Sequence, residues 1–150
     1  MKKKSHSTGK IVNRRARYDY DLSDQFEVGI ELTGVEAKSL RLGHGRLAGS
    51  YVTVKNDELY LINTLIMPST GLPINEQNQT RTRKLLAKRK EIDHIIDEKR
   101  QGRSIIPLEL LTRGRYIKLK IALGKGKKRY DKRETIKRRQ QERDIARQAK

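Results

Sequence analysis

The stretch Tyr116-Ile117-Lys118-Leu119-Lys120-Ile121-Ala122-Leu123 decides the fold class, because its large apolar side chains fall on every second position. The segment Phe26-Glu27-Val28-Gly29-Ile30-Glu31-Leu32 shows the same alternation. Successive side chains of a β-strand point to opposite faces, so this period predicts strands with one buried face and one wet face. Two such segments, far apart in the sequence, indicate a mainly β protein with an antiparallel sheet.

Three further segments have the composition of strands. Tyr51–Val54 and Leu59–Ile66 flank Asn56-Asp57, a dipeptide typical of tight turns, and are predicted to form a hairpin. The segment 106–110 is a shorter apolar run that contains Pro107. Proline has no amide hydrogen to give to a neighbouring strand, so this segment is predicted to be an edge strand or an irregular one.

Two segments are predicted to be helical. Arg81–Arg100 carries large apolar residues near helical spacing, and Gly102 follows it as a stop. The segment Val35–Leu42 fits a helix or a strand, and we favour a short helix. Between these two helices, Met67–Gln79 is predicted to be a loop. Five or so short strands with flanking helices favour a small antiparallel barrel, closed or partly closed, over a helical bundle.

The positive charge of the chain is concentrated at its two ends. The 150 residues include 36 Lys and Arg against 18 Asp and Glu, a net charge of +18, and 12 of these cations with only 4 of the acids lie in residues 124–150. Residues 1–10 hold four lysines and no acid. We therefore expect a flexible basic arm (1–10), a folded domain (11–123), and a basic tail (124–150) that begins with a glycine swivel at Gly124 and Gly126.

The composition also excludes several classes of protein. A net charge of +18 predicts a polyanionic partner, first of all nucleic acid. The chain has no cysteine and no apolar run long enough to span a bilayer, so we expect a cytoplasmic protein without disulfides and without a membrane partner. His6, His44 and His94 lack a second ligand at metal spacing, and no nucleophile stands with a base. Neither an enzyme nor a metal or cofactor site is predicted.

Two clusters of cations are candidates for binding RNA. Arg81, Arg83 and Lys84 fall in the first turn of the predicted helix, where the positive end of the helix dipole repels them. A phosphate bound at this helix end would compensate, and a solvated basic turn is the alternative. The second cluster is Asn13-Arg14-Arg15-Ala16-Arg17-Tyr18, in which Tyr18 either stacks on a base or packs the segment against the domain.

Glu27 is an acidic residue on a surface that we expect to bind RNA. It points away from the core face of its strand, and a carboxylate in that position repels phosphate. Glu27 therefore either forms an ion pair with a neighbouring arginine or accepts a hydrogen bond from the amino or imino group of an exposed base.

The C-terminal tail has the composition of a helix that lacks an apolar face. After Tyr130 it contains no Gly or Pro, and it is rich in helix formers. A helix that is polar on all sides is not stable free in water. The tail therefore either folds against a channel lined with phosphate or stays disordered and adds only nonspecific attraction.

These residues also resemble a known family, the SsrA-binding protein (SmpB) family. The similar motifs occur in the order and spacing of the family: Asn13-Arg14-Arg15-Ala16, Phe26-Glu27-Val28-Gly29, Gly34-Val35-Glu36-Ala37-Lys38-Ser39-Leu40-Arg41, Ser50-Tyr51-Val52, Arg81-Thr82-Arg83-Lys84-Leu85-Leu86, and Gly124-Lys125-Gly126-Lys127-Lys128 with Asp131-Lys132-Arg133. The similarity covers nearly the whole chain. Each motif alone is modest, but their joint occurrence is highly specific.

The resemblance implies an oligonucleotide-binding-like barrel that binds the tRNA-like domain of transfer-messenger RNA as a monomer. Members of the family escort this RNA to stalled bacterial ribosomes for trans-translation, while the tail enters the empty mRNA channel and folds there as a helix. On this chain, Asn13, Glu27, Lys84 and Leu86 fall where the family contacts its RNA. Tyr130–Arg133 fall where the tail engages the decoding centre.

Charge pattern and resemblance together give two sets of candidate residues. The predicted RNA-binding set is Asn13, Arg14, Arg15, Arg17, Glu27, Lys38, Arg81, Thr82, Arg83, Lys84 and Leu86. The predicted ribosome-binding set in the tail is Lys125, Lys127, Lys128, Tyr130, Asp131, Lys132, Arg133, Lys137 and Arg138. The alternative function, from the charge pattern alone, is a structural ribosomal protein with basic extensions.

Overall fold

The computed structural model describes residues 9–127 and 129–148. Its strands are β1 (Lys10–Val12), β2 (Tyr20–Ile30), β3 (Gly45–Arg46), β4 (Tyr51–Lys55), β5 (Glu58–Ile62), β6 (Leu65–Ile66), β7 (Arg83–Leu86), β8 (Ser104–Leu111) and β9 (Lys118–Gly126). Its helices are α1 (Ala16–Asp19), α2 (Gly34–Arg41), α3 (Glu76–Gln79), α4 (Arg89–Arg100) and α5 (Arg129–Gln148).

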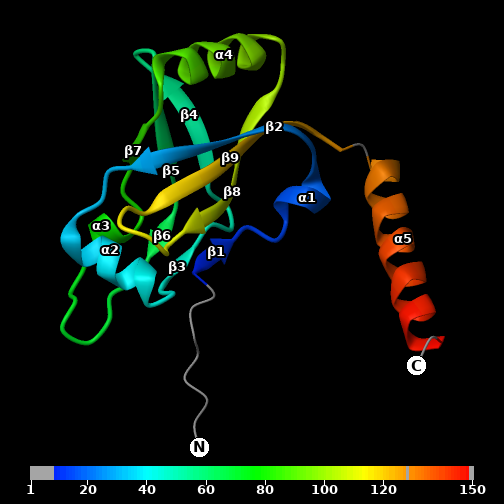
Figure 1. Ribbon diagram of the computed structural model, residues 1–150, viewed down its shortest axis with the longest axis horizontal. Coiled ribbons are helices and arrows are strands. Elements are labelled where there is room, and N and C mark those ends of the chain that lie inside the picture. The colour runs from blue at the N-terminus through cyan, green and yellow to red at the C-terminus, as the bar shows by residue number, and fades with distance from the viewer. Residues whose placement is uncertain (1–8, 128, 149–150) are drawn as a thin grey trace, which may run out of the picture.

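One curved antiparallel sheet forms the body of the protein (Figure 1). Its strands follow one another in the order β1-β8-β9-β2-β7-β5-β4, and a separate small sheet pairs β3 with β6. The edge strand β4 curls back against β8, which lies next to the opposite edge. The sheet is therefore a partly closed barrel, as the alternating segments predict.

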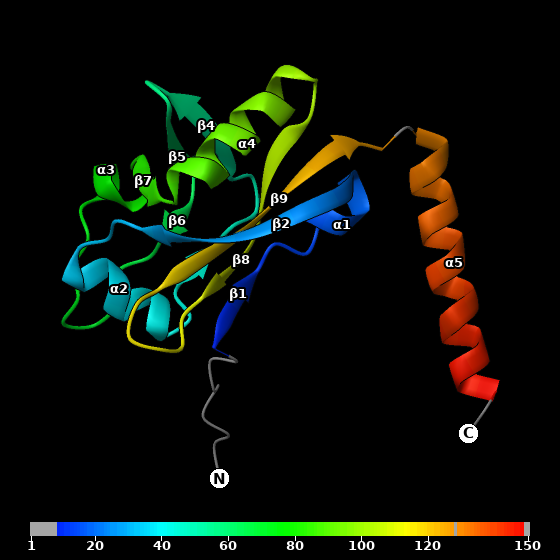
Figure 2. The same ribbon diagram turned by 45° about the horizontal axis from the view of Figure 1, so that its top comes forward.

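The barrel interior is filled by the apolar side chains that the alternation placed on one face of each strand. They include Val28 and Ile30 of β2, Leu59 and Leu61 of β5, Leu85 of β7, Ile105 and Leu110 of β8, and Leu119, Ile121 and Leu123 of β9. Helix α2 adds Leu40 and helix α4 adds Ile92 and Ile95, at opposite ends of the barrel (Figures 1 and 2). This one cluster holds most of the buried apolar surface, and helices α2 and α4 cover its two ends.

A second, smaller core lies on the outer side of β8 and β9. Ala16 of α1 packs there against Ile106, Leu108 and Ala122, with Tyr20 at its border. Helix α1 therefore covers the outer face of the sheet next to the beginning of β2.

Two local predictions are confirmed. β4 and β5 form the expected hairpin, in which Asn56 and Asp57 take φ angles of 51° and 58° that a tight turn requires. The predicted second arm, Leu59–Ile66, is however divided, because β5 ends at Ile62 and β6 pairs with β3 instead. The segment Val35–Leu42 is helical as favoured. Thr33 begins this helix with a capping box: its hydroxyl accepts from the Glu36 amide at 3.2 Å, while Glu36 accepts from the Thr33 amide at 2.9 Å.

The prediction of one helix over Arg81–Arg100 is wrong for residues 81–88. Residues 83–86 form strand β7 between β2 and β5, and the helix begins only at Arg89. Leu85 is buried while Leu86 is exposed, which is the alternation of a strand and not the shared face of a helix. The three cations therefore do not stand in a helical first turn, and the argument for a phosphate bound at that helix end no longer applies.

Of the two alternatives predicted for the strand that contains Pro107, the structure shows an irregular strand and not an edge strand. This strand, β8, lies between β1 and β9, so it is not at the edge of the sheet. The strand is irregular as predicted, because its register with β9 shifts between Pro107 and Glu109. The side-chain amide of Asn13 donates to the Pro107 carbonyl oxygen at 2.9 Å, so this part of the strand is held from the side of β1.

Both predicted boundaries of the folded domain lie too far inward. The Gly9 carbonyl accepts from the Thr112 amide at 2.9 Å, and β1 already includes Lys10. At the other end β9 continues to Gly126, so that Gly124 is paired with Leu22 and Ser104 instead of acting as a swivel. The remainder of the arm, residues 1–8, is outside the described residues.

Residues Arg129–Gln148 of the tail form helix α5, which stands away from the sheet in both views (Figures 1 and 2). Its described side chains are exposed, among them Ile136 and Ile145. Packing therefore contributes little to this helix, and disorder of the tail in the free protein stays a prediction.

Gly45 offers a test of how tightly the α2 end of the barrel is packed. A Cβ atom on Gly45 would lie 2.5 Å from Leu40 Cδ2 and 3.2 Å from Ile11 Cδ1. Leu40 is fully buried and cannot swing away, so we expect Gly45→Ala to lower the free energy of unfolding by about 1–3 kcal/mol in urea denaturation. Gly126→Ala, where an added Cβ meets nothing within 4 Å, is the control. Equal stability of the two variants would contradict this tight packing.

Candidate nucleic-acid interface

The outer face of β7, β2 and β9 brings several predicted RNA-binding residues together. Gly29 of β2 is paired with Leu86 of β7 on one side and with Lys118 of β9 on the other, and Glu27 is paired with Lys120. Because alternate residues of these strands fill the barrel, Lys84, Leu86, Glu27, Lys118 and Lys120 point outward. We call these five residues the outer-face site.

Leu86 and Glu27 border a shallow hollow between the sheet and helix α4. The hollow is lined by Glu27, Leu86, Ala87, Lys88 and Glu91. The Leu86 side chain is 49% exposed. Gly29 lets it lie close to β2, because a Cβ atom on Gly29 would come within 3.2 Å of the Leu86 Cβ. The hollow thus combines an apolar wall with a hydrogen-bond acceptor.

Glu27 makes no ion pair with any residue in the described part of the chain. Its cross-strand neighbour Lys120 lies 3.9 Å from Glu109 instead. Glu27 was predicted either to form an ion pair with an arginine or to accept a hydrogen bond from a base. Residues 9–127 and 129–148 offer it no partner for an ion pair. The carboxylate is left exposed as an acceptor among outward-pointing lysines.

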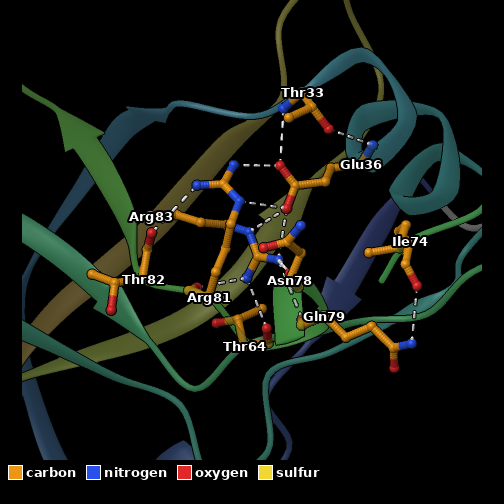
Figure 3. A network of polar contacts seen from close by, with 9 residues as sticks. All are labelled: Thr33, Glu36, Thr64, Ile74, Asn78, Gln79, Arg81, Thr82 and Arg83. Carbon is orange, nitrogen blue, oxygen red and sulfur yellow. Dashed lines mark hydrogen bonds and ion pairs between the residues drawn. The ribbon is translucent and has the colours of Figure 1, made fainter. Parts of the chain in front are cut away.

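Arg81 and Arg83 belong to a different structure, a network around the buried carboxylate of Glu36. Figure 3 shows both guanidinium groups turned toward this carboxylate. Arg83 Nε donates to Glu36 Oε2 at 2.8 Å, and Arg81 Nε donates to the same oxygen at 3.1 Å. Arg81 Nη2 is bonded to Glu36 Oε1 as well. The side chain of Arg83 is fully buried, while that of Arg81 is 32% exposed.

Every N–H group of the Arg83 guanidinium has an acceptor. Besides Glu36, it donates to the carbonyl oxygens of Thr64 at 2.8 Å, Arg81 at 3.1 Å, Asn78 at 3.1 Å and Gln79 at 3.2 Å (Figure 3). A buried charge is tolerated when it is paired and fully hydrogen-bonded. Arg83 therefore joins β7 to α2, to α3 and to the loop before β6.

The network sets the charge state of Glu36. Burial alone would raise the pKa of this carboxyl group, but hydrogen bonds from Arg81, from the Thr33 amide and from Arg83 outweigh that effect and hold the pKa below its ordinary value. Burial also lowers the pKa of Arg83, and Glu36 opposes this. Both groups are charged at neutral pH, so the network is a true ion pair.

These contacts correct the predicted RNA-binding set. Arg83 is buried and fully bonded, so it has no surface to offer RNA, and Arg81 is directed at Glu36. The compensating anion inferred for these cations is present, but it is a carboxylate of the protein and not a phosphate. Thr82 and Lys84, the neighbours of Arg83 on the outward-facing positions, remain accessible. Sequence reasoning missed Glu36, whose only signal was the local capping pattern with Thr33.

The cluster around Asn13 lies at the other end of β2. Glu27 is seven residues beyond Tyr20, which is about 23 Å along a strand. The Arg15 guanidinium carbon lies 5.0 Å from the centre of the Tyr18 ring, Arg15 also lies 3.5 Å from Asp19, and Tyr18 is half-buried. Stacking of Tyr18 on a base therefore stays a prediction. Arg14 and Arg17 are exposed. The structure therefore does not join this cluster to the outer-face site.

The remaining predicted residues are spread over α2 and the tail. Lys38 is exposed on α2. Lys127 Nζ donates to the Arg17 carbonyl at 2.9 Å, which fixes the end of β9 to α1. Lys125, Arg133, Lys137 and Arg138 are exposed, and Lys128 lies outside the described residues. Tyr130, Asp131 and Lys132 are placed by their backbone in α5.

Within 9–127 and 129–148, no group of three His, Cys, Asp or Glu side chains is arranged to hold a metal ion. No helix in the described part of the chain is long and apolar enough to cross a bilayer.

Comparisons with known proteins agree on one family. The family model described as SmpB protein matches residues 10–150. An SsrA-binding protein of Trichormus variabilis is 45% identical over 154 residues, covering 100% of this chain and 99% of the relative. An SsrA-binding protein of Streptococcus pyogenes serotype M49 is 45% identical over 139 residues, covering 92% of this chain and 90% of the relative.

A solved structure supports the same assignment. A chain from the structure described as "tmRNA-SmpB: a journey to the center of the bacterial ribosome" matches with a TM-score of 0.67 and 34% identity, over 86% of this chain and 95% of that one. The barrel, the order of the motifs and the full-length relatives lead to one conclusion. The chain belongs to the SmpB protein family.

Proposed function

We propose that this chain is an RNA-binding adaptor for transfer-messenger RNA, which it carries to stalled ribosomes in trans-translation. Membership of the SmpB family, relatives named SsrA-binding proteins and the likeness to a tmRNA–SmpB ribosome structure support this function. The observation in the structure that carries it is Glu27, which has no ion-pair partner among the described residues and lies beside the exposed Leu86 on the outer face of β2 and β7.

The outer-face site has the parts needed to bind a folded RNA and to recognise one of its bases. Lys84, Lys118 and Lys120 attract the phosphate backbone, which gives affinity without sequence preference. Glu27 can accept hydrogen bonds only from a base edge or a ribose hydroxyl, because it repels phosphate. Leu86 offers an apolar surface to an unstacked base. The site thereby favours an RNA that presents an exposed base over a regular helix.

The tail has a separate role in this proposal. Its exposed cations, including Arg133, Lys137 and Arg138, suit the phosphate-lined mRNA channel and decoding centre of the ribosome. The barrel would thus hold the RNA while the tail reports an empty channel. A structural ribosomal protein, the alternative function, would instead co-sediment with translating ribosomes at fixed stoichiometry, whereas an adaptor follows one small RNA.

Glu27→Gln tests the part of the site that recognises a base. We expect this variant to bind the tRNA-like domain of transfer-messenger RNA about tenfold more weakly, because a charge-assisted hydrogen bond is replaced by a neutral one. The measurement is the dissociation constant at a fixed salt concentration.

Glu76→Gln is the matched control, since Glu76 is also an exposed carboxylate without an ion pair in the described residues, and it lies on α3. Removal of either carboxylate raises the net charge by one. If Glu27→Gln binds the RNA as tightly as Glu76→Gln does, or more tightly than the unchanged protein, Glu27 contacts no base.

A further inference from the structure

The loop that joins β8 to β9 is held in one conformation by an arginine from another element. The loop, residues 112–117, begins and ends with buried residues, Thr112 and Ile117, and between them Gly114 has a φ of +89°. The Arg41 side chain, from the last turn of α2, donates through Nη1 to the carbonyl oxygens of Thr112 at 2.9 Å and Gly114 at 2.8 Å.

The clamp has a third contact. Arg41 Nη2 donates to the Arg115 carbonyl oxygen at 3.0 Å, so one guanidinium group binds three carbonyl groups of four successive residues. A loop that only connects two strands does not need such a clamp, because surface loops tolerate mobility. A clamped loop presents its side chains in fixed directions, which lowers the entropy cost of binding a ligand.

The clamped loop presents an aromatic ring and several cations. Tyr116 is 69% exposed, and the Arg115 guanidinium carbon lies 5.6 Å from the centre of its ring. Leu42, the residue after Arg41, is 56% exposed. The loop lies beside α2 in both ribbon views (Figures 1 and 2). An exposed tyrosine next to an arginine is the arrangement on which unpaired nucleotides stack.

The charge around the loop favours a polyanion. Arg113 and Arg115 are exposed, as are Lys38 on α2 and Lys118 at the start of β9. None of these four cations forms an ion pair with a described residue, so their charge is not neutralised within residues 9–127 and 129–148. A protein partner would need a matching acidic surface, whereas RNA supplies both the phosphates and a base that can stack.

We propose that loop 112–117, clamped by Arg41, is a second RNA-binding site of this protein. It holds an unpaired nucleotide, whose base stacks on Tyr116 and whose neighbouring phosphates lie near Arg113 and Arg115. This second site goes beyond the adaptor function. It rests on that function in one respect, namely that the partner of the protein is an RNA. The two sites recognise a base differently. At the loop the base stacks on an aromatic ring, whereas at the outer-face site it donates a hydrogen bond to Glu27.

The test uses the full chain labelled with nitrogen-15 and titrated with oligouridine of about ten nucleotides, a length typical for single-strand binding sites. We expect the backbone amide signals of residues 113–116 to shift, and their titration curves to give a dissociation constant for this site alone. Tyr116→Ala should raise that constant about tenfold, while Tyr116→Phe should leave it unchanged.

Tyr51→Ala is the matched control, because Tyr51 is 52% exposed on β4 and is not part of the loop. Arg41→Lys tests the clamp, since an ammonium group cannot hold three carbonyls in this fork. We expect it to weaken binding at the loop, and to weaken it no further when combined with Tyr116→Ala.

Loop signals that stay in place at saturating oligouridine would overturn the proposal, even if tail signals shift. A loop that shifts equally with a duplex RNA would also overturn it, because stacking requires an unpaired base. If the loop binds a protein and not RNA, its signals would likewise stay in place at saturating oligouridine. Glu27→Gln, measured with the tRNA-like RNA, reports on the adaptor function independently, so failure of one proposal is distinguishable from failure of the other.

Discussion

Glu36→Gln is expected to lower the free energy of unfolding by about 3–5 kcal/mol, the largest stability effect that we predict for one substitution. The substitution leaves the fully buried Arg83 guanidinium without its countercharge, together with the nearby charge of Arg81. Breaking a buried ion pair from one side costs more than the pair itself contributes, because the remaining charge cannot reach water. Urea denaturation followed by circular dichroism measures the effect.

The control for this substitution is Glu58→Gln, which removes a carboxylate from a partly exposed ion pair. Glu58 lies 3.9 Å from Arg89, and both side chains reach solvent, so we expect a change within about 0.5 kcal/mol. A loss below about 1 kcal/mol for Glu36→Gln would mean that water or another acceptor replaces the carboxylate beside Arg83.

The same network makes the free energy of unfolding depend on pH. The pKa of Glu36 is lower in the folded protein than in the unfolded chain, so its carboxylate stabilises the fold at pH values above its ordinary pKa of about 4.3. This contribution is lost as the pH falls through the lower folded pKa, because the carboxyl group is then protonated in both states. Glu36→Gln should therefore lose less stability than the unchanged protein over the same acid range.

Removal of residues 128–150 is expected to reduce peptide tagging on stalled ribosomes to the level seen without the protein. The truncation ends after Lys127, because β9 runs to Gly126 and the Lys127 amide still donates to the Asp19 carbonyl. The barrel keeps its described core, to which α5 contributes no residue. The measurement is translation in vitro of an mRNA without a stop codon, with transfer-messenger RNA supplied.

A matched pair of substitutions separates the charge of the tail from its helical form. Arg138→Pro and Arg138→Ala remove the same exposed cation, but only proline breaks a helix, at a cost of about 3 kcal/mol or more. We expect Arg138→Pro to lose most tagging and Arg138→Ala to retain most of it. Equal activity of the two variants would mean that α5 need not be helical on the ribosome.

Much of the barrel could be predicted from the sequence, because the residues concerned obey simple alternation. Val28 and Ile30, like Leu119 and Ile121, occupy every second position, and each of them is buried. The turn at Asn56 and Asp57 was predictable for a similarly local reason, since those residues tolerate the φ angles of a tight turn.

The segment before α4 could not be predicted, because its reason lies far away in the chain. Arg83 can be buried in a strand only because Glu36, which is 47 positions earlier, supplies a countercharge. Without that partner, a basic segment followed by Leu85 and Leu86 has the appearance of an exposed helix start. For the same reason Arg83 was placed in the RNA-binding set, where its charge suggested a surface role that its burial excludes.

The candidate site was predicted in part. Glu27 could be identified from its outward position in an alternating strand. That it has no ion pair within the described part of the chain could not, because this depends on Lys120 lying near Glu109. Leu86 followed from resemblance alone, and its place opposite Gly29 required the register between β7 and β2. The clamp of Arg41 on loop 112–117 left no local signal, since it joins residues more than 70 positions apart.

The most direct measurement is the binding of residues 1–127 and of the full chain to the tRNA-like RNA across a series of salt concentrations. If the barrel binds this RNA and the tail serves the ribosome, both proteins bind with similar affinity and similar, modest salt slopes. The contrary result is a truncated protein that loses binding, with a slope reduced by several phosphate contacts at ~0.7–0.9 each. The tail would then be the main RNA-binding element, and the outer-face site would not be the RNA-binding surface.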